Sequence, residues 1–135
     1  MALDNHAWPS TMRHMVAADA SRVMTELRRG VVEHCVLALI GEGESYAFDI
    51  VKVLAARHLV TSEGTIYPLL ARLRRDGLVA TNWRESSSGP PRRYYRLTDD
   101  GRRALDVFVA EWSAFRTAVD ALLNARVAAE VRDGR

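Results

Sequence analysis

Three observations in the 135-residue sequence predict a mostly α-helical protein that carries one small β-hairpin and ends in a long helix. Apolar residues recur at helical spacing in three segments before residue 77. Two segments of strand-like composition then flank a stretch rich in serine, glycine and proline at residues 84–91. After residue 104, apolar residues again recur with a helical period. The chain length and a hydrophobic content of 48% fit one domain with its own core.

The first twenty residues show little periodicity, and we expect a loose arm or a short extra helix there. The first periodic helix is expected over residues 20–40, with an apolar face at i, i+3, i+4 and i+7 that comprises Val32, Cys35, Val36 and Leu39. The glycine-containing segment GEGES, residues 41–45, ends this helix. Ser45 is placed to cap a second helix over residues 46–57. The residues that this second helix would bury are Tyr46, Ile50, Val53 and Leu54.

The third helix is expected in the segment SEGTIYPLLARLRRDGLV, residues 62–79. Its core face comprises Ile66, Leu69, Leu70 and Leu73. Gly77 is typical of the residue that follows the end of a helix. The sequence leaves the start of the helix open. Pro68 either removes one helical hydrogen bond, or it lies in the first turn if Thr65 is the cap.

Strands are expected over residues 78–83 and 92–97, with residues 84–91 as the tip of the hairpin. Tyr94 and Tyr95 are neighbours on the second strand, so one is expected to pack inward and the other to face outward. Thr98 is placed to cap the last helix. Apolar residues spaced 3, 4, 3, 4 and 3 apart on this helix are typical of helix-on-helix association. These candidate dimerisation residues are Leu105, Phe108, Trp112, Phe115, Val119 and Leu122.

Three helices followed by a hairpin are the arrangement of a winged helix-turn-helix, whose third helix enters the major groove of DNA. Charge supports this interpretation. Residues 57–103 hold ten arginines and five acidic residues, although the whole chain has a net charge of only +2. Arginines on the outer side of the third helix can reach phosphates, and Gly64 would allow a close approach of the backbone to DNA. The arginines concerned are Arg72, Arg74 and Arg75.

From about Leu27 to Leu122 the chain resembles the PadR family of bacterial transcriptional regulators. The resemblance lies in the motifs LRRGVVEHCVLALI, SEGTIYPLLARLRRDGLV and GPPRRYYRLTDDGRRAL. It implies a homodimeric winged-helix repressor in the bacterial cytoplasm, bound to a roughly palindromic operator of double-stranded DNA. Release from the operator would follow binding of a small aromatic or drug-like effector.

The resemblance also implies roles for single residues. Gly64, Thr65, Tyr67 and Pro68 match the part of the recognition helix that meets DNA, while Arg92 and Arg93 match the basic wing. Ser62 and Gly89, beside these two motifs, complete the candidate DNA-binding residues. Trp112 matches a tryptophan that lines a ligand cavity in some members, so Trp112, Phe108 and Phe115 are candidate ligand-binding residues, with dimer packing as the alternative. Phe48 departs from the family, which commonly has a tyrosine there, and it lacks a hydroxyl for a phosphate.

Other classes of function find little support in the sequence. His34 and Cys35 are adjacent and would point about 100° apart on a helix, so we expect no metal site, no cofactor and no catalytic pair. No run of 18 apolar residues exists, so no membrane span is expected. The single cysteine suits a reducing cytoplasm. The alternative that remains is a winged-helix interaction module whose basic surface binds an acidic protein.

These expectations divide the chain into four parts. Residues 1–22 form the N-terminal arm or short extra helix, and residues 23–98 form the winged-helix domain. Residues 99–128 form the dimerisation helix, and residues 129–135 form a loose tail.

Overall fold

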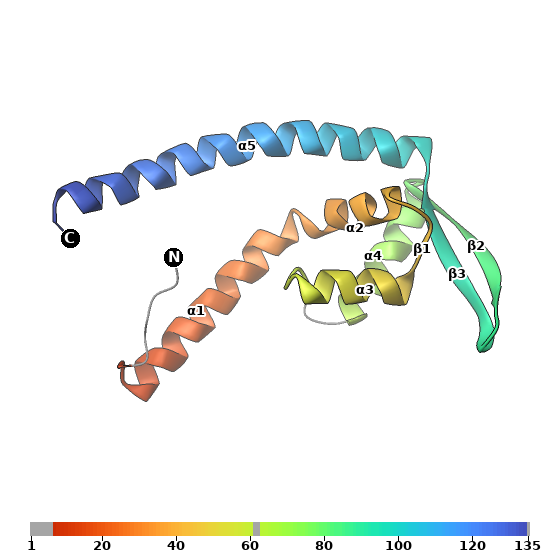
Figure 1. Ribbon diagram of the computed structural model, residues 1–135, viewed down its shortest axis with the longest axis horizontal. Coiled ribbons are helices and arrows are strands. Elements are labelled where there is room, and N and C mark those ends of the chain that lie inside the picture. Colours follow the sequence, from red (N-terminus) through yellow and green to blue (C-terminus); the bar gives the residue numbers. More distant parts are fainter. Residues whose placement is uncertain (1–6, 61–62, 135) are drawn as a thin grey trace.

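The computed structural model describes residues 7–60 and 63–134. Its elements follow the expected order of helices, hairpin and long final helix (Figure 1). They are α1 (Ser10–Arg29), α2 (Val32–Gly41), β1 (Ser45–Tyr46), α3 (Ala47–Ala56), α4 (Glu63–Arg75), β2 (Val79–Ser86), β3 (Gly89–Leu97) and α5 (Asp99–Arg132). The strands form one antiparallel sheet in the order β1–β3–β2. Helices α1 and α5 project from the same side of the unit formed by the remaining elements.

One hydrophobic core holds α2, α3, α4 and the sheet together. On α4 the expected apolar face is confirmed, because Ile66, Leu70 and Leu73 are fully buried and Leu69 is half-buried against them. On α2 the expected Val36 is buried, but Leu37 and Ile40 are buried as well. Helix α2 packs against α5, α3 and β3, so its buried surface is wider than the single stripe that the sequence pattern indicates. The buried residues of this core all lie in the winged-helix unit, residues 32–97, and Leu105 of α5 packs against them.

The helix expected over residues 20–40 is in fact two helices. Helix α1 ends at Arg29 and α2 begins at Val32, because Gly30, which has a low helix propensity, lies between them. The guanidinium of Arg28 donates two hydrogen bonds, of 2.8 and 3.0 Å, to the carbonyl oxygen of His58 in the turn after α3. His58 has a φ of 58°, in the left-handed region. These bonds fix the end of α1 against the turn that leads to α4.

Helix α1 also begins much earlier than the sequence pattern indicated. It starts at Ser10, so most of the expected arm is helical, and it continues across the domain boundary expected between residues 22 and 23. No residue of α1 is buried. The weak periodicity of this segment follows from the absence of a packed face within the chain.

Strand β1 was not expected, and it corrects the role of Ser45. Ser45 pairs with Tyr95 and Tyr46 pairs with Tyr94, so both residues are extended and α3 begins only at Ala47. The Ser45 hydroxyl donates to the carbonyl oxygen of Gly43 at 3.1 Å. The expected cap was wrong because pairing with β3 fixes the backbone in an extended form before the helix can begin. Tyr46 is half-buried rather than buried.

The hairpin is longer than expected, and its tip is smaller. Strands β2 and β3 extend into residues 84–91, so that Ser86 pairs with Gly89 and only residues 87 and 88 form the turn. Two prolines are tolerated at residues 90–91 because β1 pairs only with the far end of β3, which leaves one edge of β3 open there. Tyr95 is buried and Tyr94 is half-buried, as their alternation predicted.

Helix α5 is anchored at its N-terminus. As expected, the Thr98 hydroxyl oxygen caps the helix by accepting a hydrogen bond of 3.0 Å from the Gly101 N–H. The same hydroxyl donates to the carbonyl oxygen of Gly77 at 2.7 Å. A Cβ atom on Gly101 would collide with the carbonyl oxygen of Leu78, so only glycine fits at this junction. The helix then runs to Arg132, beyond the end expected near residue 128, and it includes part of the expected tail.

Candidate nucleic-acid interface

Helix α4 presents its non-core residues on two different sides. Thr65, Pro68, Arg72 and Arg75 lie on the side that faces α1 and α2, where they line a groove. Tyr67, 47% exposed, lies on another side. Thr65 and Tyr67 were both expected to meet base edges, but two residues apart on a helix they point about 160° apart. The structure therefore places these two candidate contacts on opposite flanks of α4.

The start of α4 settles the position of Pro68. The helix includes Glu63, and Pro68 lies inside it, so the proline removes one backbone N–H from the helical ladder rather than occupying the first turn. Gly64 belongs to the first turn and is exposed. Ser62, a candidate contact from the sequence, lies outside the described residues.

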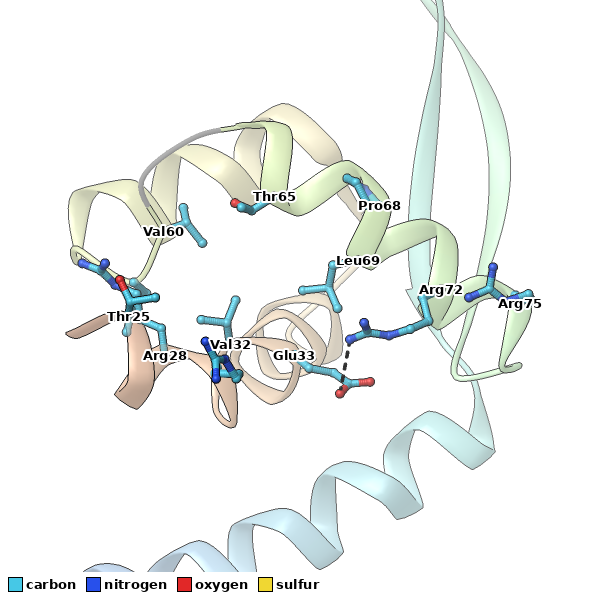
Figure 2. Close-up of a pocket in the computed structure, with 12 residues that line it drawn as sticks. Thr25, Arg28, Val32, Glu33, Val60, Thr65, Pro68, Leu69, Arg72 and Arg75 are labelled. Carbon is cyan, nitrogen blue, oxygen red and sulfur yellow. Dashed lines mark ion pairs between the residues drawn. The ribbon is translucent and has the colours of Figure 1, made fainter. Parts of the chain in front are cut away.

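The groove beside α4 has a volume of about 600 Å³ (Figure 2). Its walls are α4, the end of α1, the start of α2 and the turn after α3. An ion pair spans it, with Arg72 Nη2 located 3.6 Å from Glu33 Oε2 on α2. Arg72 is therefore held toward α2. Arg74 is exposed and lies near Tyr67 around the helix axis.

The wing arginines lie on opposite faces of β3. The guanidinium of Arg92 lies 4.7 Å from the ring centre of Tyr46, while that of Arg93 lies 4.8 Å from the ring centre of Trp83. Arg92 is exposed, but Nε of Arg93 is buried and lacks a hydrogen-bond partner within the described part of the chain. The sequence treats the two residues alike, and the structure gives Arg92 the freer access to a phosphate. Gly89 is exposed beside the turn.

Arg84 is a further cationic residue of the wing, and it is not among the candidates that the sequence predicts. Its guanidinium lies 4.8 Å from the ring centre of Tyr94, and it pairs with Glu44. Because Arg84 is the strand partner of Arg92, both extend from the same face of the hairpin. The sequence pattern that could have identified Arg84 is the alternation within NWRES, which places Trp83 and Arg84 on opposite faces of β2. Phe48, the departure from the family pattern, is 43% exposed, and Lys52 lies 5.6 Å from its ring centre.

The predicted seam on α5 divides into two parts. Leu105 packs against the core, and the Phe108 ring stacks on His34 with a centroid distance of 3.9 Å. Beyond them, Trp112 is 38% exposed and Phe115 is 63% exposed. Val119 is half-buried, and Leu122 is 76% exposed. The first part of the seam thus holds α5 to the winged-helix unit, and the second part is left facing outward.

Cys35 packs against the core, and the His34 ring stacks on Phe108. Burial raises the pKa of the Cys35 thiol, so the thiol stays protonated and is a poor nucleophile. In residues 7–60 and 63–134, no group of three or more histidine, cysteine or acidic side chains is placed to hold a metal ion. Over the same ranges, no helix is long and apolar enough to cross a membrane.

Comparison with known proteins decides the family. A model of the "Transcriptional regulator PadR-like family" matches residues 36–107, which is more than half of the chain. The chain belongs to the PadR-like family. This PadR-like protein is 38% identical to a PadR family transcriptional regulator from Eggerthella lenta, whose crystal structure superposes with a TM-score of 0.71, covering 81% of this chain and 96% of that one.

The chain is also similar to a curated regulator and, in fold, to a further solved structure. The transcriptional regulator Rv3488 of Mycobacterium tuberculosis is 35% identical over 82 residues, which are 61% of this chain and 76% of the relative. The fold is also similar to that of Bacillus subtilis PadR in complex with operator DNA. That likeness has a TM-score of 0.54, 23% identity, and coverage of 58% of this chain and 46% of that one. PadR-like proteins are transcriptional regulators and not enzymes, as the sequence predicted.

Proposed function

We propose that this PadR-like protein is a homodimeric repressor that binds a roughly palindromic operator and is released by a small aromatic molecule. The observation that carries the proposal is α4, whose leucine face is buried while Tyr67 and Arg74 stay exposed beside the basic hairpin. A helix held in this way can enter the major groove while the wing contacts phosphates. The operator-bound structure of Bacillus subtilis PadR supports DNA as the partner. Such a regulator works in the bacterial cytoplasm, where the operator is.

The outward part of α5 supports the dimer. Trp112, Phe115 and Leu122 form a row of exposed apolar residues on the part of α5 that projects beyond the winged-helix unit. Rows of this kind mark interaction sites, and two copies that bury the same row give a two-fold interface. In such a dimer, the two copies of α4 would enter successive major grooves when they lie about 34 Å apart. The angle between the two protomers sets this distance.

The same region supports an aromatic effector. Phe108, Trp112 and Phe115 form a continuous row of rings, with centroid distances of 6.0 Å and 6.3 Å between neighbours. Two such rows across a two-fold axis can hold a flat ring by offset stacking. A ligand there would weaken DNA binding only as far as it prefers a dimer angle that does not fit the operator.

Tyr67→Ala tests the proposal. A duplex selected from a random library serves as the operator, and binding to it is compared with binding to a shuffled duplex by fluorescence polarisation. Loss of a base-edge contact should cost about 1 to 3 kcal/mol on the selected duplex and little on the shuffled one. Arg126→Ala, on α5 away from the wing, is the control and should change the affinity for neither duplex.

Two results would contradict the repressor. One is unchanged discrimination in Tyr67→Ala. The other is equal binding of the wild type to any polyanion, such as heparin, which would favour the module that binds an acidic protein.

A further inference from the structure

The groove beside α4 has the composition of a site for an organic anion. Its floor is apolar: Val60 is buried, and Val32, Leu59 and Leu69 are half-buried around it. Figure 2 shows Val32 and Leu69 facing one another across the space between α2 and α4. The volume of about 600 Å³ lies within the range of small-molecule sites in proteins.

The rim of the groove is basic. Four arginines line it, and Glu33 is the single acidic residue among the lining residues. The arginines are Arg28, Arg29, Arg72 and Arg75. A guanidinium has five N–H donors, so Arg28, which binds the His58 carbonyl oxygen, and Arg72, which pairs with Glu33, both keep donors for a ligand. Carboxylates are the anions whose geometry this fork matches.

One wall of the groove is formed by residues outside the range that the family model matches. Thr25, Arg28 and Arg29 come from α1, whereas the family model matches only residues 36–107. The bonds from Arg28 to His58 hold this wall against the turn before α4. The opposite wall is α4 itself, through Thr65 and Pro68. The groove therefore joins the N-terminal helix of this chain to the helix that we propose reads DNA.

We propose that this groove binds an amphipathic organic anion, with a flat apolar body over Val32 and Leu69 and a carboxylate on the arginine rim, and that the bound anion excludes DNA from this flank of α4. The inference rests on the proposed DNA-binding function. It differs from the effector site proposed on α5, because the ligand would act at the recognition helix directly. Occupancy would cover Thr65 and Pro68 and would engage Arg72.

The test uses 2-naphthoate as the probe and neutral 2-naphthol as its uncharged counterpart. Both are titrated into the full ¹⁵N-labelled chain without DNA and followed by ¹H–¹⁵N NMR. Naphthoate should shift the Thr25 and Thr65 amides, and naphthol should bind more weakly. Thr25→Glu adds a negative charge at the groove. It should weaken naphthoate binding about tenfold, because the new carboxylate repels the carboxylate of naphthoate through solvent. Ala20→Glu makes the same charge change about 140° around α1 and should have no effect.

Further arms separate the two proposals. Trp112→Ala should keep naphthoate binding in the groove, because that residue belongs to the α5 site. Naphthoate should also lower the affinity of wild type and Trp112→Ala for the selected duplex, and Thr25→Glu should need about tenfold more naphthoate for the same loss. Equal naphthoate binding by Thr25→Glu and Ala20→Glu, shifts confined to α5, or a bound naphthoate that leaves DNA affinity unchanged would each overturn the inference. A wild type that binds no duplex would defeat the repressor and the exclusion of DNA, while the NMR result would still decide whether the groove binds the anion.

Discussion

Helix α4 of the winged-helix unit and helix α5 have similar apolar patterns, but only the pattern on α4 is buried along its whole length. In the unit, Ile66, Leu70 and Leu73 of α4 are 0% exposed. On α5, Phe115 and Leu122 have comparable helical spacing but are 63% and 76% exposed, and α1 has no buried residue at all. Apolar periodicity thus identifies a face that must be covered. It does not say whether the same chain covers it.

This difference predicts two kinds of stability. Burial of apolar side chains within the unit stabilises one chain by itself. The exposed apolar row on α5 contributes only when a partner covers it, so its contribution depends on protein concentration. Three sets of substitutions test this division, in order of decreasing effect.

Leu70→Ala should lower the free energy of unfolding by about 2 to 5 kcal/mol, because it leaves a cavity in a fully buried site. This loss of stability should be the same at every protein concentration.

Phe115→Asp, the counterpart on α5, should instead leave the unit folded and shift the chain from dimer to monomer. Urea unfolding at two concentrations and sedimentation velocity measure both effects. A stable wild-type monomer at micromolar concentration would contradict this division between the unit and α5. A loss of stability in Leu70→Ala that depends on protein concentration would contradict it as well. Phe115 is a better test site than Phe108, because Phe108 also stacks on His34 within the chain.

Gly101→Ala probes the junction between the two regions. The new Cβ would collide with the Leu78 carbonyl oxygen, so the start of α5 must move, at a cost of about 1 to 3 kcal/mol. Gly30→Ala is the matched control, since a Cβ there meets nothing within 4 Å and its φ of −93° suits alanine. Thermal unfolding of the two variants should differ clearly. Equal melting temperatures would show that α5 is not fixed at this glycine.

The smallest effect concerns the two arginines of the wing, Arg92 and Arg93. Loss of one phosphate contact flattens the dependence of log affinity on log salt concentration by about 0.9 of a unit. Arg92→Ala and Arg93→Ala should each weaken binding to all duplexes alike if both residues contact phosphate. Titrations of a shuffled duplex at several salt concentrations measure the slope. If only Arg92→Ala changes it, Arg93 supports Trp83 instead of binding DNA.

Local signals in the sequence predicted the parts of the fold that depend on local contacts. The core face of α4 and the Thr98 cap were predicted because each depends on residues within a few positions of one another. Strand β1 was missed because Ser45 and Tyr46 become extended only through pairing with a strand about fifty residues later. The cap expected at Ser45 failed for the same reason.

The sequence names candidate site residues but does not give the directions in which their side chains point. Spacing identified α4 and the wing as basic elements, but it treated Arg92 and Arg93 as equivalent although they lie over different rings. It also could not place Arg72 against Glu33 or Phe108 against His34, because these contacts join different helices. The groove has no signal in the sequence, since its walls come from segments far apart in the chain.

Because α5 is held only in its first part, a small rotation there produces a large displacement at its far end. Thr98, Leu105 and Phe108 hold its first part, and the 24 residues from 109 to 132 extend about 36 Å beyond them. A rotation of about 10° at the end of the held part carries the far end of the helix through about 6 Å over such a length. A displacement too small to disturb the core of the winged-helix unit is thereby magnified at Arg132. Substitutions around Leu78 and Gly101 should therefore alter geometry at the far end of the molecule more than they alter their own surroundings.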